Sequence, residues 1–74
     1  MQRLYSFASS LGTFYICASA HRYYAVLEDT LVDFYSSPEK VAFAVALQFN
    51  LPLVAGDDIG QLIPADLGEW QKCK

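Results

Sequence analysis

Charged side chains are scarce in this chain, and the basic ones are scattered. Asp, Glu, Lys and Arg make up 18% of the 74 residues, and five basic against eight acidic residues leave a net charge of -3. Proteins that bind a phosphate backbone need clustered positive charge. Arg22 stands beside Tyr23 and Tyr24, but one cation next to two aromatics is too little for a stacking platform. The composition therefore disfavours nucleic-acid binding.

Cysteine and histidine are also few, which limits metal and redox chemistry. The single His21 has no second His or Cys at ligand spacing and there is no CxxC pair, so we expect no zinc site within one chain. Adjacent Asp57 and Asp58 lack the alternating ligands of a calcium loop. A bridge between Cys17 and Cys73 would need the tail to return to the sheet, so we expect free thiols. We expect no cofactor.

Long apolar runs are absent as well. No stretch is long enough and free enough of breakers to span a membrane, and the segment from Leu4 to Phe14, interrupted by Ser and Gly, is a poor fit to a secretory leader. An apolar fraction of 54% excludes a disordered chain. We predict a soluble, cytoplasmic protein in which residues 1–74 form a single small domain.

Catalytic groups are not placed together along the chain. Ser36-Ser37 and Ser9-Ser10 have no histidine nearby, so a hydrolase triad would need His21 and a carboxylate to be brought beside one of them. A domain of this size has one thin core, which rarely encloses a water-excluding pocket. We therefore predict that the protein is not an enzyme.

The first half of the chain is rich in β-forming residues, broken by short turn clusters. Alternation places Phe14, Ile16 and Ala18 on one side of a strand and Tyr15 and Cys17 on the other. The segments expected to form strands are Leu4–Ala8, Thr13–Ser19, Tyr23–Leu27 and Thr30–Tyr35. They predict a three- or four-stranded antiparallel sheet.

One main helix should follow the strands. Ser37 can cap its first turn, Pro38 suits the first helical position and Glu39 favours the positive end of the dipole. We expect the helix to end near Asn50, because Pro52 cannot continue the hydrogen-bond ladder. The fold class is therefore α+β, with the helix packed on one face of the sheet.

The chain after this helix carries weaker signals. We expect an extended segment over Leu51–Ala55 and a turn over Gly56–Gly60. A short helical turn should run from Pro64 to Trp70, with Ile63 and Leu67 buried beside it. The last residues, Lys72–Lys74, should be frayed.

The helix carries more apolar residues than one buried face needs. Val41, Val45 and Phe49 fall on one arc, which should pack against Ile16 and its neighbours. Phe43 and Leu47 fall on the opposite, polar arc, which Glu39, Lys40 and Asn50 mark. Either the C-terminal segment covers them, or they contact another molecule.

Two hypotheses of function follow. In the first, the protein is an interaction module that self-associates into a homodimer, or binds another protein, through Phe43, Ala46 and Leu47. In the second, it binds a small ligand or a nucleic acid on an aromatic sheet face. The residues of that second face are His21, Arg22, Tyr23 and Tyr24.

Several motifs together resemble a family of small uncharacterised bacterial proteins. The most specific are the Ser-Pro-Glu helix start at 37–39 and the Pro-Ala-Asp-Leu-Gly-Glu-Trp tail at 64–70, together with Gly12-Thr13 and Gly56-Asp57-Asp58. The resemblance covers most of the chain and implies a small sheet with one helix, but no activity, cofactor or substrate. The family tends to have acidic residues and Gly where this chain has Phe43, Ala44 and Leu47, which favours the interaction hypothesis for this protein.

Overall fold

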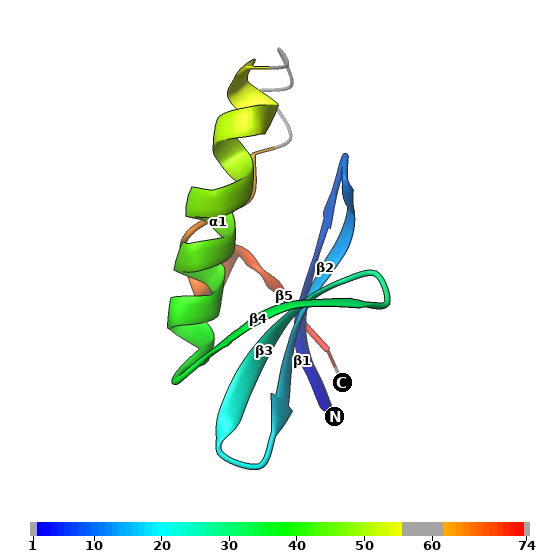
Figure 1. The fold of residues 1–74 in the computed structure, drawn as a ribbon, viewed down its shortest axis with the longest axis vertical. Helices are drawn as coiled ribbons and strands as arrows, with labels where there is room; N and C mark the ends of the chain where they lie inside the picture. The colour runs from blue at the N-terminus through cyan, green and yellow to red at the C-terminus, as the bar shows by residue number, and fades with distance from the viewer. Residues whose placement is uncertain (1, 56–61, 74) are drawn as a thin grey trace.

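A twisted five-stranded antiparallel sheet, covered on one face by a long helix, makes up the fold (Figure 1). The computed structural model describes residues 2–55 and 62–73. The elements are β1 (Gln2–Ser9), β2 (Gly12–Ser19), β3 (Arg22–Leu27), β4 (Thr30–Tyr35), α1 (Pro38–Ala55), the 3-10 helix η2 (Leu67–Glu69) and β5 (Gln71–Lys72). The strand order is β4-β3-β2-β1-β5. The α+β prediction is confirmed, although the sheet has one strand more than expected.

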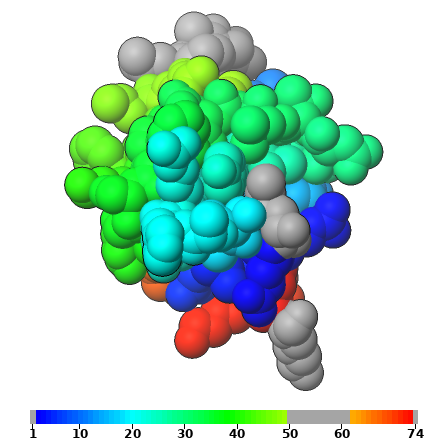
Figure 2. All heavy atoms as spheres, turned by 60° about the horizontal axis from the view of Figure 1, so that its bottom comes forward, coloured from blue at the N-terminus to red at the C-terminus, as the bar shows by residue number. Residues whose placement is uncertain are grey.

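Strands β1 to β4 form a meander of three hairpins with two-residue turns. Each turn contains or adjoins one residue with a positive φ angle: Gly12 at 124°, Ala20 at 55° and Glu28 at 54°. In the β1–β2 turn, the backbone N–H of Leu11 donates to Ser9 Oγ at 3.2 Å, and Ser9 Oγ donates to the carbonyl oxygen of Gly12 at 2.7 Å. Figure 2 views the molecule from the end that carries the β2–β3 turn, whose cyan atoms lie at the front.

The extra strand comes from the end of the chain. In β5, Gln71 and Lys72 pair with Ser6 and Tyr5 of β1. The N–H of Cys73 then donates to the carbonyl oxygen of Leu4 at 2.9 Å. The expectation of a frayed end is therefore wrong for Lys72 and Cys73, because the edge of β1 offers backbone partners to both.

Helix α1 begins as predicted. The backbone N–H of Lys40 donates to Ser37 Oγ at 3.2 Å, and that of Val41 donates to the Ser37 carbonyl oxygen at 3.2 Å. The helix continues to Ala55, so the expected end near Asn50 and the extended segment after it are wrong. A proline inside a helix removes one hydrogen bond and crowds the carbonyl of the preceding turn, yet the helix continues through Pro52. The turn predicted over Gly56–Gly60 lies outside the described residues.

The core lies between α1 and the covered face of the sheet. Phe14, Ile16, Val41 and Val45 are buried, and the rings of Phe14 and Phe49 lie 5.0 Å apart, which confirms the predicted facing of the helix. The other members of the cluster are Ala25, Ala42, Ala46, Ile63 and Trp70. Of the predicted tail residues, Ile63 is buried and Leu67 half-buried. No helix in the described ranges is both long and apolar enough to cross a membrane.

Candidate interaction surfaces

One face of the sheet packs on α1, whereas the other is not covered by any described element. Because strand residues alternate between faces, the neighbours of the core positions in β2 and β3 point away from the helix. In the paired register, Tyr24 lies opposite Phe34, and Val26 lies opposite Leu31. We call this surface the open sheet face; its large side chains are those of Arg3, Tyr15, Cys17, Arg22, Tyr24, Val26, Leu31 and Phe34, and the small polar Ser6 and Ser19 lie on the same face.

The part of the open sheet face formed by β3 and β4 carries apolar side chains, where a solvated face is normally polar. Antiparallel sheets with one wet side usually alternate apolar residues inward with polar residues outward. Here the outward positions of β4 hold Leu31 and Phe34, which are 54% and 47% exposed. Beside them, Tyr24 and Val26 of β3 are half-buried. Large apolar side chains are thus exposed side by side on two neighbouring strands.

Two arginines lie over aromatic rings of this face. The Arg3 Cζ atom is 4.0 Å from the centroid of the Tyr15 ring, and the Arg22 Cζ atom is 4.5 Å from that of Phe34. The Tyr24 and Phe34 rings are 6.0 Å apart. Stacking of this kind is favourable and lets the arginine stem cover apolar surface while the guanidinium N–H groups remain free to donate.

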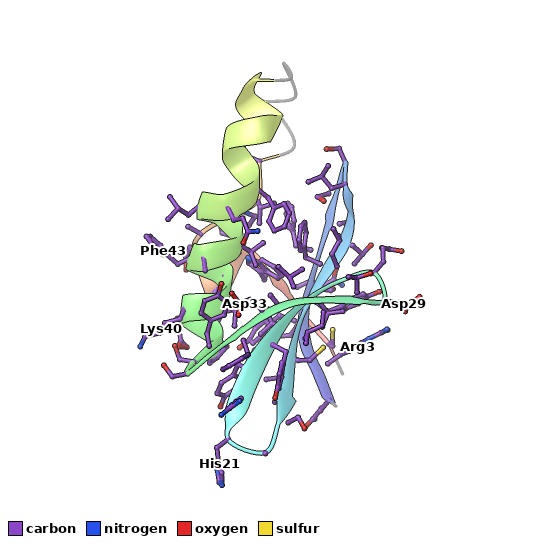
Figure 3. The ribbon with its side chains drawn as sticks, viewed as in Figure 1. Arg3, His21, Asp29, Asp33, Lys40 and Phe43 are labelled. Carbon is purple, nitrogen blue, oxygen red and sulfur yellow. The ribbon has the colours of Figure 1, made fainter. Side chains whose placement is uncertain are left out.

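A shallow hollow of about 320 Å³ lies at one end of the open sheet face, with charges of opposite sign around it. Its lining residues are Arg3, Cys17, Val26, Glu28, Asp29 and Leu31. Figure 3 shows Arg3 and Asp29 on the same side of the molecule, away from α1. The Glu28 carboxylate is already engaged, because its Oε2 accepts the backbone N–H of Thr13 at 2.6 Å. Burial raises the pKa of the Cys17 thiol, and Arg3 offsets part of this pKa shift.

The outer face of α1 carries the second exposed apolar group. Phe43 and Leu47 are 59% and 65% exposed, as their position on the polar arc predicts, and Figure 3 shows Phe43 and Lys40 pointing away from the sheet. The described C-terminal residues leave both exposed. Ala46, which we had expected beside them, is only 4% exposed and belongs to the core with Ala42, one helical turn earlier. The exposed apolar surface of the helix therefore consists of Phe43 and Leu47, which we call the Phe43–Leu47 ridge.

The four residues predicted as an alternative ligand face do not share one surface. His21 projects from the β2–β3 turn (Figure 3), while Arg22 and Tyr24 belong to the open sheet face. Tyr23 packs against the core on the helix side, since adjacent strand residues point to opposite faces. Arg3, which is not among the four predicted residues, joins the open sheet face through the pairing of β1 with β2.

The described part of the chain contains no disulfide and no group of side chains suited to a metal ion. Cys17 and Cys73 are both free thiols, although the tail does return to the sheet. Among the described residues, no three His, Cys, Asp or Glu side chains are grouped to hold a metal ion. Comparisons of the chain with models of protein families, with curated proteins and with solved structures gave no match.

Proposed function

We propose that this protein is a non-enzymatic interaction module that self-associates, and that the contact is made by the open sheet face. The observation that carries the proposal is the exposure of Leu31 and Phe34 on a face that would be polar if it met only water. A second copy supplies the missing layer, as in sandwiches where two sheets pack face to face about 10 Å apart.

The size of this face predicts a weak dimer. Four strands spaced about 4.8 Å apart and about 20 Å long give a footprint of roughly 400 Å². Stable complexes bury about 800 Å² on each partner. Leu31 and Phe34 would remove about 200 Å² per subunit from water, worth about 10 kcal/mol for two subunits at 25 cal/mol per Å². Since association costs about 4–15 kcal/mol, we expect a Kd in the micromolar range or weaker.

The Phe43–Leu47 ridge is a competing surface for the same function. Phe43 and Leu47 are more exposed than Leu31 and Phe34. Ala46 cannot extend the ridge, because the Ala46 side chain is buried between the helix and the sheet. The ridge therefore offers two side chains from one helix, whereas the open sheet face offers neighbouring side chains from several strands. The larger and flatter surface is the better candidate for contact with a second copy.

A matched pair of double variants separates the two surfaces. Leu31→Gln with Phe34→Gln removes the apolar exposure of the sheet, and Phe43→Gln with Leu47→Gln does the same on the helix, without any change in charge. Sedimentation velocity over a concentration series should show that the sheet variant is monomeric while the helix variant dimerises like the wild type. The reverse outcome would move the interface to the helix, and a wild type that stays monomeric at high micromolar concentration would end the proposal.

The stacked arginines favour a second candidate function, the binding of a planar small molecule or a single-stranded nucleic acid. Guanidinium groups over exposed rings are found on stacking platforms. Against this, Asp29 and Glu28 lie at the edge of the same face, and the net charge of -3 repels phosphates. Fluorescence anisotropy of a labelled poly-thymidine oligonucleotide at low salt tests this function. Binding that weakens with salt and is lost in Arg22→Gln would support it, and constant anisotropy would reject it.

A further inference from the structure

We infer that two copies of this chain meet through their open sheet faces about a two-fold axis that crosses the strands near Val26, so that Arg22 of each copy pairs with Asp29 of the other. The inference rests on the proposed function and adds to it the geometry of the partner. It assigns an intermolecular role to two charges that lie at opposite ends of β3.

The distribution of charge along β3 selects this axis. Arg22 is the first residue of the strand, Asp29 lies in the turn just after its end, and Val26 lies near the midpoint between them. An axis parallel to the strands would place the Arg22 end of one copy on the Arg22 end of the other, with like charges together. An axis across the strands reverses the second copy and places each cation on a carboxylate. Charge complementarity therefore favours the crossing axis.

Neither charge is engaged in an ion pair within its own chain, as far as the described residues go. The Cζ atom of Arg22 lies 4.5 Å from the centroid of the Phe34 ring, so the guanidinium lies over the open sheet face while the residue stays exposed. Asp29 lies on the rim of the hollow at the other end of that face. In contrast, the Glu28 carboxylate is occupied by the N–H of Thr13. Asp29 is thus the carboxylate available to a second copy.

The centre of the same arrangement is apolar. Val26 and Leu31 are opposite each other in the register of β3 and β4, so both lie close to the axis and would meet their own counterparts. Both residues also line the hollow of about 320 Å³, which extends from them to Asp29. Apolar contacts near the axis with charge pairs at both ends match the usual anatomy of an interface, an apolar core inside a polar rim.

A charge-reversal complementation experiment tests the inference. In a dimer of Arg22→Glu, the new carboxylate at position 22 of each copy would face Asp29 of the other copy, so both ends would carry like charges. In a dimer of Asp29→Lys, the new ammonium group at position 29 of each copy would face Arg22 of the other copy, again with like charges at both ends. Each variant alone should therefore dimerise at least tenfold more weakly than the wild type. A mixture of the two restores an opposite-charge pair at both ends, so a heterodimer should form with near wild-type affinity. Analytical ultracentrifugation with one variant fluorescently labelled measures both affinities.

Lys40→Glu serves as the matched control, because Lys40 lies on the outer face of α1 and its reversal should leave dimerisation unchanged. Circular dichroism should show the wild-type fold for all three variants, since the reversed side chains are exposed. The inference fails if the wild type dimerises but the two reversals leave its affinity unchanged, or if their mixture gives no heterodimer. Those results leave the proposed function intact, whereas a monomeric wild type removes both.

A cross-link gives an independent measurement of the axis. In a background of Cys17→Ser and Cys73→Ser, the variant Leu31→Cys places a thiol next to its own counterpart. Mild oxidation should then convert most of the protein to a covalent dimer on a non-reducing gel. Leu47→Cys in the same background should form such dimers only slowly. Equal cross-linking at the two positions, or faster cross-linking at position 47, would overturn the inferred contact.

Discussion

The indole Nε1 of Trp70 donates a hydrogen bond to the backbone carbonyl oxygen of Pro64 at 2.8 Å, which closes the C-terminal segment on itself around η2. The Trp70 ring is only 5% exposed and lies 5.9 Å from the ring of Phe7 on β1. One side chain therefore holds the tail both to its own turn and to the sheet.

Replacement of Trp70 should be among the most destabilising single changes in this protein. Trp70→Ala removes a buried ring and should lower the free energy of unfolding by about 3–5 kcal/mol. Trp70→Phe keeps much of the packing but leaves the Pro64 carbonyl without its donor, and should cost about 1–3 kcal/mol. Urea denaturation measures both, with the exposed Gln71→Ala as control. Removal of all residues after Asp58 should cost at least as much as Trp70→Ala, and an unchanged unfolding midpoint would show that the tail adds no stability.

Gly12 is a second sensitive position. Its φ is +124°, and a Cβ atom there would lie 3.0 Å from Cγ of Glu28 and 3.3 Å from Cδ1 of Leu27. Gly12→Ala should therefore destabilise the fold by about 1–3 kcal/mol. Gly68→Ala is the control, since its added Cβ would come no closer than 3.4 Å to Asp66 and its φ is not positive. Equal thermal midpoints for the two variants would contradict the prediction.

Tyr35 should titrate above its ordinary range. Burial raises the pKa of Tyr35, and Asp33 raises this pKa further through its charge and a hydrogen bond. A tyrosine whose pKa is higher in the folded than in the unfolded state binds more protons when folded, so its contribution to stability is lost as pH rises above about 10, the ordinary tyrosine value. Asp33→Asn should lower the pKa of Tyr35. Phenolate absorbance, compared with Tyr35→Phe, measures the shift, and an unchanged titration would contradict the role of Asp33.

We expect the same aspartate to protect the outer edge of β4 from pairing with another chain. β4 is an edge strand, and Asp33 Oδ1 accepts the backbone N–H of Phe34 at 2.8 Å. A charged residue on an edge strand opposes pairing with another chain. Asp33→Val should therefore increase aggregation near the unfolding midpoint, as measured by light scattering during heating. Thr30→Val, at the start of the same strand, is the control, and aggregation no greater than in this control would argue against the protective role.

The two thiols should differ in reactivity. Cys17 is buried and its pKa is raised by that burial, whereas Cys73 is half-exposed at the end of the chain. Because the thiolate is the reactive form, Ellman's reagent at neutral pH should modify Cys73 well before Cys17. The variants Cys17→Ser and Cys73→Ser report each rate separately. Faster reaction of Cys17 would mean that the open sheet face admits reagents more freely than its burial indicates.

Local chemistry explains which parts of this fold could be predicted. The cap at Ser37 and the buried arc of Val41 and Val45 depend on residues a few positions apart, and both are confirmed. Ala46 was misplaced because alanine is small enough to fit either face, so its position in the pattern carried little information. The helix beyond Asn50 could not be predicted, because proline normally ends or kinks a helix whereas this helix continues through Pro52.

Most features that could not be predicted depend on pairing between segments that are far apart in the sequence. Two residues, Gln71 and Lys72, have no alternation from which a strand could be predicted, and their partner strand lies at the other end of the chain. The register of β3 and β4 also shifts between Ala25 and Val26. Strict alternation therefore cannot assign every side chain of β4 to a face, and the exposure of Leu31 and Phe34 emerges only from the paired strands.

The position of β5 at the edge of β1 has a consequence for the order of folding. The three hairpins join neighbouring segments and need only short loops to close, so they can form early. The contact of Lys72 with Tyr5 joins residues separated by nearly the whole sequence. During synthesis it cannot form until the segment through Lys72 has left the ribosome, and until then the outer edge of β1 has unpaired backbone groups. We expect the docking of β5 to be the last step in assembly of the sheet, and the nascent meander to be the stage most open to pairing with other chains.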